Sequence, residues 1–160
     1  MSHAQAEQRL SPELFSYLQA HHPIVVITVG ADGGPATDMV SWVLAVDDHT
    51  VRLVVGSQRP AVTNIRANGM AALQILGRDL AYEIKGTARI IKERCESFRF
   101  PQMMIELRVD SVRENMYPAN FVTGDVPVGW PESTDAHHGA WNAAIAEEMR
   151  RERSATCSLG

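Results

Sequence analysis

The sequence predicts a mainly β protein with flanking helices, folded as a six-stranded antiparallel β-barrel. Short runs rich in β-branched and other apolar residues recur along the first two thirds of the chain, as strands require. Turn signals made of glycine, aspartate and asparagine separate most of these runs, and tight turns join antiparallel neighbours. We therefore expect strands at residues 23–29, 39–46, 51–55, 70–76, 80–91 and 103–109.

A short helix is expected before the barrel. Ser11 can cap it, Pro12 suits the first helical position, and Glu13 complements the positive end of the helix dipole. Pro23 should end this segment and begin the first strand. Residues 30–34, which include three glycines and an aspartate, are expected to form a hairpin turn.

The second expected strand, 39–46, is apolar at almost every position, which indicates a central strand buried on both faces. Residues 80–91 instead alternate between an apolar and a polar face, which indicates burial on one side. Gly86 lies in the middle of that run. Glycine there favours a bend or bulge, which helps a sheet to curl towards closure.

One connection between strands is too long for a tight turn. Within residues 56–69, Val62 and Ile65 have helical spacing, Pro60 suits a helix start, and Gly69 suits a helix end. A helix inserted between two barrel strands is therefore the main irregularity that we expect.

The C-terminal part of the chain differs from the barrel. Residues 114–135 contain three prolines and two glycines and should form a long loop, and loops of this length are usually functional or mobile. Residues 140–153 are helical by propensity, with Trp141, Ile145 and Met149 on one stripe. We expect a single domain over residues 1–160, with the barrel at about 23–112 and the C-terminal loop and helix at about 113–153.

Composition narrows the possible function classes. The 160 residues carry 15 Lys and Arg against 19 Asp and Glu, and this net charge of −4 disfavours nucleic-acid binding.

Residues 1–10 do not form a secretion signal, and no apolar run is long enough to span a membrane. Cys95 and Cys157 lie outside any metal-ligand spacing. They are typical of a reducing cytoplasm, although two cysteines could also pair.

Adjacent histidines occur twice, at residues 21–22 and 137–138. Neither pair has an acidic or thiol partner at ligand spacing, so we expect no metal site. No catalytic side chain can be named from the sequence.

The segment 56–64 is the best candidate for a binding site. Gly56 permits close backbone approach, Ser57 and Thr63 supply hydroxyls, and the Arg59 guanidinium can pair with a phosphate. A helix N-terminus adds backbone N–H groups and a favourable dipole. Together they predict a site for one phosphate monoester, and the alternative is a solvated loop with a helix cap.

Residues 39–53, with the sequence MVSWVLAVDDHTVRL, resemble the second and third strands of the pyridoxamine 5′-phosphate oxidase-like family, which has the FMN-binding split-barrel fold. The resemblance continues through Arg59, residues 62–68 and residues 84–88, and covers about 23–112. It consists of short patches, so it is more specific for the fold than for the reaction.

The resemblance implies a homodimer of split barrels with FMN in a groove between the subunits. Carried over by position, Ser41 and Trp42 would lie along the isoalloxazine ring. The residues around the ribityl phosphate would be Ser57, Arg59, Thr63 and Asn64, and Gly56 completes the cofactor-binding set.

The chain departs from the true oxidases at two residue pairs. Those enzymes carry an Arg-Lys pair at the start of the inserted helix and an Arg-Gln pair entering the fifth strand, where this chain has Pro60-Ala61 and Leu80-Ala81. Their C-terminal substrate signature of arginine and histidine is not recognisable in residues 130–153. Oxidation of vitamin B6 is therefore not expected, and Arg59 is left as the main partner for a phosphate.

These observations favour an FMN-dependent oxidoreductase that acts on an unidentified small molecule. The alternative is a non-enzymatic protein on the same dimeric fold that holds a flavin, a deazaflavin or a haem-type ligand. A third hypothesis is a structural dimer whose groove has lost its ligand.

Overall fold

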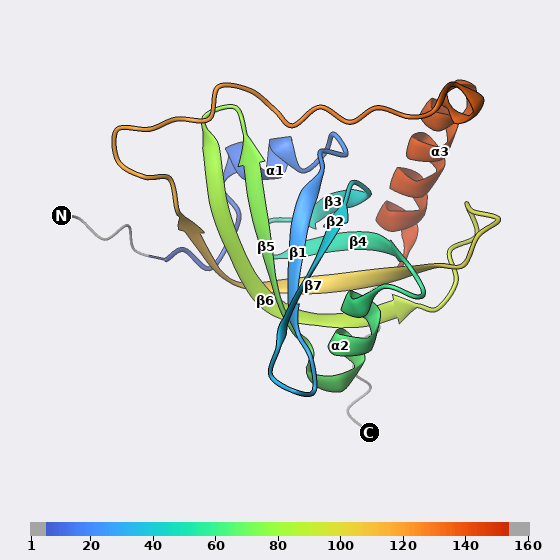
Figure 1. Ribbon diagram of the computed structural model, residues 1–160, viewed down its shortest axis with the longest axis horizontal. Coiled ribbons are helices and arrows are strands. Elements are labelled where there is room, and N and C mark those ends of the chain that lie inside the picture. Colours follow the sequence, from blue (N-terminus) through green and yellow to red (C-terminus); the bar gives the residue numbers. More distant parts are fainter. Residues whose placement is uncertain (1–5, 154–160) are drawn as a thin grey trace.

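A computed structural model describes residues 6–153, apart from the side chains of residues 133–136 (Figure 1). The described residues form one antiparallel sheet of seven strands, in the order β2-β1-β5-β6-β7-β4-β3. The mainly β barrel with flanking helices is thereby confirmed. The elements are α1 (Pro12–Tyr17), β1 (Ile24–Val29), β2 (Pro35–Val40), β3 (Val43–Asp47), β4 (Thr50–Gly56), α2 (Pro60–Asn68), β5 (Met70–Gly77), β6 (Leu80–Lys92), β7 (Gln102–Glu114) and α3 (Glu132–Arg151).

The single strand expected at residues 39–46 is in fact two strands, so the barrel has seven strands rather than six. Ser41 and Trp42 separate β2 from β3, and these two strands form the opposite edges of the sheet. The prediction of a central strand buried on both faces is also wrong, because Met39 is 61% exposed. Of the two strands that replace it, β3 is the one covered on both sides, by the barrel interior and by α3.

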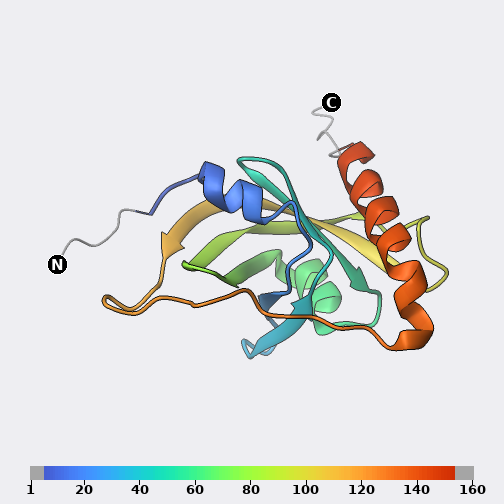
Figure 2. The same ribbon diagram turned by 90° about the horizontal axis from the view of Figure 1, so that it is seen from above.

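Two apolar clusters hold the sheet and its helices together. The barrel interior is filled by fully buried side chains of its strands, with Leu14 and Leu18 from the α1 segment packed against them. A second cluster lies outside the barrel, where Ile145 and Met149 of α3 pack on Leu44 of β3. Figure 2 shows α3 lying along the outside of the sheet. The apolar stripe predicted for this helix is confirmed, although the helix begins earlier than expected.

The local signals in the first half of the chain are confirmed. Ser11 Oγ accepts a hydrogen bond from Leu14 N at 3.2 Å and caps α1. The hairpin between β1 and β2 turns at Gly33, whose φ is +81°. Helix α2 begins at Pro60 and ends at Asn68, and Gly69 after it has the left-handed conformation expected of a glycine that ends a helix. Among the described residues no helix combines the length and the apolar character needed to cross a membrane.

Gly86 marks the bend predicted in the long strand. The pairing register between β6 and β7 shifts between Lys85 and Gly86. A Cβ atom at Gly86 would lie 2.1 Å from the backbone oxygen of Arg108, so only glycine lets β7 approach this closely. The bulge increases the local twist and helps the sheet to curl.

We expect Gly86→Ala to lower the free energy of unfolding by about 3 kcal/mol or more, because the new methyl group would push β6 and β7 apart. Urea unfolding of the variant measures this loss. Gly139→Ala is the control: a Cβ at this helical position meets no atom within 4 Å. It should stabilise the protein by up to about 1 kcal/mol through helix propensity. Equal stability of the two variants would contradict the close approach at Gly86.

A buried carboxylate attaches α3 to the barrel. Glu148 is 1% exposed and accepts hydrogen bonds from the backbone N–H groups of Glu96 and Ser97, at 2.8 and 3.0 Å. The hydroxyl of Ser97 and the ammonium of Lys92 also contact this carboxylate, at 2.5 and 3.0 Å. Burial by itself raises the pKa of Glu148, but these hydrogen bonds, led by that of Ser97, outweigh it and lower the pKa to about 2.

The low pKa of Glu148 predicts acid sensitivity. Its ionised form stabilises the folded state fully above about pH 4.5, and this contribution is lost as the pH falls towards 2. We expect Glu148→Gln to cost about 2–3 kcal/mol at pH 6 and progressively less as the pH falls below 4.5. Denaturant unfolding over this pH range tests the expectation. The exposed neighbour Glu147, changed to Gln, should alter stability by less than about 0.5 kcal/mol.

Candidate functional site

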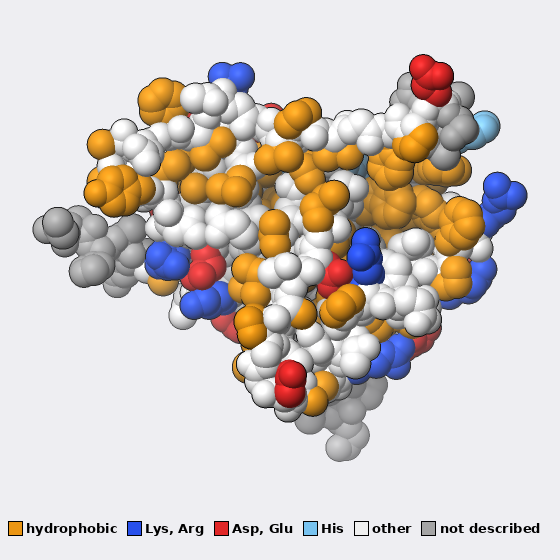
Figure 3. All heavy atoms as spheres, in the orientation of Figure 1, with side chains coloured by type: hydrophobic (Ala, Val, Ile, Leu, Met, Phe, Trp, Pro, Cys, Tyr) orange, Lys and Arg blue, Asp and Glu red, His pale blue; other side chains and the backbone are white. Residues whose placement is uncertain are grey.

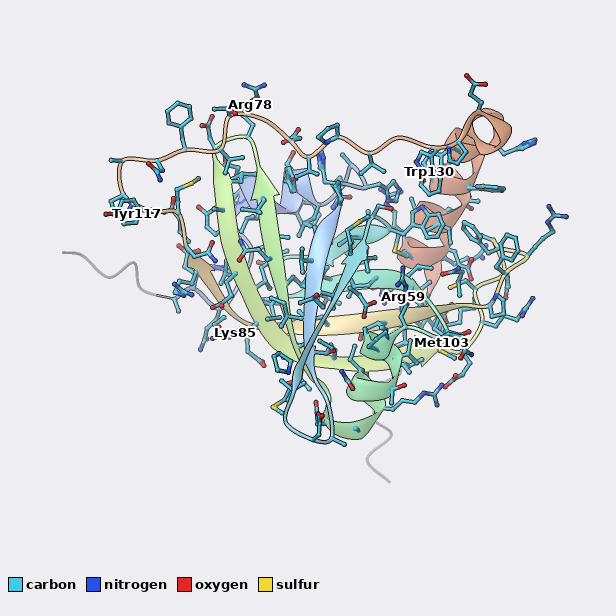
Figure 4. All side chains as sticks on the ribbon, viewed as in Figure 1. Arg59, Arg78, Lys85, Met103, Tyr117 and Trp130 are labelled. Carbon is cyan, nitrogen blue, oxygen red and sulfur yellow. The ribbon has the colours of Figure 1, made fainter. Side chains whose placement is uncertain are left out.

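A groove of about 270 Å³ opens at the residues that join the two edge strands of the sheet. It lies between the end of β2, the end of β4 and the loop that precedes α3. Its lining residues are Asp38, Met39, Val40, Ser41, Trp42, Val54, Val55, Gly56, Arg59, Gln102 and Trp130. Figure 4 shows Trp130 beside the upper part of α3 and Arg59 below it, above α2.

The structure brings together four of the seven residues predicted to bind a cofactor, namely Ser41, Trp42, Gly56 and Arg59. The other three do not line the groove. Ser57 donates its backbone N–H to Pro101 O at 3.1 Å, Thr63 is exposed, and buried Asn64 donates from Nδ2 to Thr28 Oγ1 at 2.9 Å. Thr63 and Asn64 are successive residues of α2 and so point about 100° apart, which prevents both side chains from reaching one place.

Two tryptophans form an aromatic wall on one side of the groove. The rings of Trp42 and Trp130 are nearly parallel, at 19°, with their centroids 6.3 Å apart. Trp42 also packs on Phe98 at 4.4 Å, and its Nε1 donates to Asn142 Oδ1 at 2.9 Å. These contacts hold the Trp42 ring in a single orientation relative to α3.

Asp38 lies at the opposite end of the groove, where the sequence predicted a phosphate. Its side chain is 3% exposed, and its Oδ2 accepts the backbone N–H of Ala61 at 3.0 Å. Its Oδ1 lies 3.8 Å from Nε of Arg59, whose side chain is 62% exposed. The sequence analysis missed Asp38 because this residue lies in β2 and caps α2 from there. No spacing of neighbouring residues predicts a cap of this kind.

The first turn of α2 therefore has few N–H groups left for an anion. Pro60 has no N–H, Ala61 donates to Asp38, and Val62 donates to the backbone oxygen of Arg59 at 3.0 Å. The helix end that was expected to bind an anion already holds a carboxylate of the protein itself.

A second cavity, of about 450 Å³, adjoins the groove and shares Ser41 and Trp130 with it. We call it the histidine pocket, because His21, His22 and His138 line it. The His138 ring packs on Trp130, with the centroids 3.9 Å apart. Within the described part of the chain, His21 Nδ1 and His138 Nε2 are buried without a hydrogen-bond partner.

The pKa of His21 is lowered mainly by burial. A hydrogen bond with the backbone of Asn142 opposes this effect, and the charge of Arg150 adds to it. His21 is therefore predominantly neutral at pH 7, with the lone pair of one ring nitrogen free to accept. The described residues contain no cluster of three or more His, Cys, Asp or Glu side chains that could hold a metal ion.

A family model described as pyridoxamine 5′-phosphate oxidase matches residues 10–116 of the chain. The chain belongs to this family. The match includes every barrel strand and nearly all residues of the groove, but ends before Trp130 and α3. The family resemblance of the sequence is thereby confirmed, together with the split-barrel fold that it implied.

Solved structures of this fold are similar to the chain. A pyridoxamine 5′-phosphate oxidase-like protein from Lactobacillus delbrueckii is 20% identical, with a TM-score of 0.58 over 70% of this chain and 98% of that chain. An FMN-binding protein from Syntrophomonas wolfei is 12% identical, with a TM-score of 0.53 over 66% and 88% of the two chains. HutZ, the haem storage protein from Vibrio cholerae, is 12% identical, with a TM-score of 0.50 over 66% of this chain and 94% of that chain. At these identities the similarity shows the fold alone, and a comparison with curated proteins gave no match.

The start of α2 departs from the pattern that the family resemblance implied for the true oxidases. Where the true oxidases are expected to have an Arg-Lys pair, Pro60 is exposed and Ala61 is fully buried. Neither residue can direct a cation into the groove. Arg59 is the cation that lines the groove in the described structure, and it lies beside Asp38.

A double-mutant cycle can measure the energy of the hydrogen bond between Trp42 and Asn142. We expect Trp42→Phe and Asn142→Ala each to lower the free energy of unfolding, because each leaves the other polar group without its partner. The coupling between the two changes should be about 0.5–1.5 kcal/mol in chemical denaturation. Additive effects would mean that this contact does not hold α3 against the groove.

Proposed function

We propose that this protein binds a flavin-type ligand, with the ring system of the ligand in the groove against Trp42 and Trp130. The observation that carries the proposal is the aromatic wall of Trp42 and Trp130 beside Ser41. The family resemblance implied a ring at Ser41 and Trp42, and the structure adds Trp130 to them. Aromatic side chains recognise planar heterocycles by stacking, and apolar lining residues such as Val54 and Val55 exclude water from them. The Syntrophomonas wolfei protein of this fold, which is FMN-binding, supports the same class of ligand.

With such a ligand bound, the protein would act as an oxidoreductase on a small molecule. A bound flavin supplies hydride and electron transfer, whereas the protein supplies binding and orientation. The Ser41 hydroxyl and the Gln102 amide are the polar lining groups able to form hydrogen bonds with the edge of a ring. We assign no proton donor among the lining residues, and the substrate is not specified by the groove.

The residues of the groove fit the two ends of FMN unequally. The aromatic wall suits the ring, but the first turn of α2 does not suit the phosphate, since Asp38 already accepts the N–H of Ala61. FMN as the particular cofactor therefore stays a prediction, and our proposal concerns the ring.

A homodimer would complete the site. The volume of about 270 Å³ is small for a pocket that encloses a ligand, since such pockets usually measure roughly 300–1,000 Å³. Met39 lines the groove and is 61% exposed, and the nearby loop exposes Val126 and Val128. Figure 3 shows hydrophobic side chains spread over this face of the molecule. We propose that a second copy covers this surface, which light scattering at micromolar concentration would test: a monomeric mass would contradict it.

We propose a cytoplasmic location on the basis of one thiol. Cys95 is free and fully buried, and burial, followed by the nearby charge of Glu148, raises its pKa to about 12. Its thiol is therefore protonated and unreactive at neutral pH, which suits a protein that does not rely on disulfides. Cys157 lies outside the described residues.

A haem-type ligand is the second candidate, and the histidine pocket favours it. A neutral imidazole nitrogen is a common haem ligand, and His138 Nε2 has no partner among the described residues. HutZ, which shares the fold, is a haem storage protein.

Titration with riboflavin and, separately, with haemin distinguishes the two candidates. We expect flavin fluorescence to be quenched on binding, and Trp42→Ala to weaken binding by roughly tenfold or more, since stacking on an aromatic ring contributes about 1–3 kcal/mol. Tyr117→Ala is the control, because Tyr117 lies far from Trp130 along the loop and is 73% exposed (Figure 4). A shifted Soret band with haemin that His138→Ala abolishes, without any flavin binding, would instead establish the second candidate.

A further inference from the structure

We infer that the groove selects a flavin-type ligand without a terminal phosphate, such as riboflavin, over its phosphorylated form, and that Asp38 makes this selection. The inference rests on the proposed function and names the class of ligand for the same site. It follows from three features at the start of α2: its hydrogen bonds, its charge and its accessibility.

Hydrogen bonding is the first feature. A helix N-terminus binds phosphate through N–H groups that have no partner within the helix. In α2 the first position is Pro60, the Ala61 N–H donates to Asp38, and the Val62 N–H donates to the backbone oxygen of Arg59. A phosphate would have to displace the Asp38 carboxylate to gain a donor from this turn.

Charge is the second feature. Asp38 is a carboxylate with a 3% exposed side chain, and Arg59 lies 3.8 Å from it, so the pair contributes a net charge near zero at this end of the groove. A phosphate placed beside a poorly hydrated carboxylate is repelled more strongly than it would be in water. No second cation lines the groove in the described structure to offset this repulsion.

Accessibility is the third feature. Although its side chain is 3% exposed, Asp38 lines the groove. Its Oδ1 lies 3.8 Å from Nε of Arg59, which is too long for a normal hydrogen bond. A carboxylate oxygen of this kind can accept from the hydroxyl of an uncharged polyol chain. The same group that repels a phosphate can therefore bind the ribityl hydroxyls of riboflavin.

The experiment compares riboflavin with FMN, which share the ring and the ribityl chain and differ by the phosphate alone. Both are titrated into the full-length protein and into Asp38→Asn at one ionic strength, with flavin fluorescence as the readout. The asparagine oxygen can still accept the Ala61 N–H, so the cap on α2 is retained, and thermal unfolding verifies the fold. The native protein should bind riboflavin at least about tenfold more tightly than FMN, and Asp38→Asn should reduce or reverse that ratio by strengthening FMN binding about tenfold.

Asp32→Asn is the matched control. Asp32 Oδ1 also accepts a backbone N–H, that of Gly34 at 2.9 Å, but it lies at the exposed hairpin tip, away from the groove. This variant should leave both affinities unchanged.

Each outcome decides something different. If the native protein binds FMN more tightly than riboflavin, or if Asp38→Asn leaves the ratio of affinities unchanged, the inference is overturned while the proposed flavin binding stands. If neither flavin binds to any of the proteins, the proposed function fails, and the inference falls with it.

Discussion

The closure of the sheet is the constraint on which the rest of the structure depends. β2 and β3 are the two edges of a seven-stranded sheet, yet only Ser41 and Trp42 join them along the chain. The sheet must therefore curl until the end of β2 comes close to the start of β3. Gly86 permits the necessary bend, because any side chain there would collide with the backbone of Arg108. The groove opens at this junction, so the same constraint that closes the barrel places Ser41 and Trp42 at the candidate site.

Buried carboxylates connect parts of the chain that are distant in sequence. Glu148 attaches α3 to the turn at Glu96 and Ser97, and Asp38 attaches β2 to the start of α2. Glu106 lies between the guanidinium groups of Arg52 and Arg89, each at 2.9 Å. A buried charge is tolerated only when its hydrogen bonds are satisfied, so each of these contacts fixes the relative position of two elements. By attaching α3, Glu148 also holds Asn142 against Trp42, and thereby one wall of the groove.

The groove combines a feature that favours a flavin with one that disfavours a phosphate. Trp42 and Trp130 offer a planar surface, whereas Asp38 and Arg59 offer no net charge. The family establishes the fold, but the fold by itself is compatible with proteins as different as an FMN-binding protein and a haem storage protein. Under the function that we propose, a few side chains of the groove would therefore select the ligand, and Asp38 would be the one that disfavours a phosphate.

Local signals in the sequence determined much of this structure. Strand alternation, the cap at Ser11, the hairpin glycines and the boundaries of α2 all depend on residues close to one another in the chain, and for this reason they were predictable. Gly56 and Arg59 were expected in one site from the segment 56–64 itself, and only the family resemblance anticipated that Ser41 and Trp42 would join them. The division of residues 39–46 into two edge strands, the capping of α2 by Asp38 and the meeting of Trp130 with Trp42 were decided by the tertiary structure. These features join residues that are remote in sequence, and no local pattern specifies which buried donor a distant carboxylate will satisfy, or which edge of a closed sheet a loop will cover.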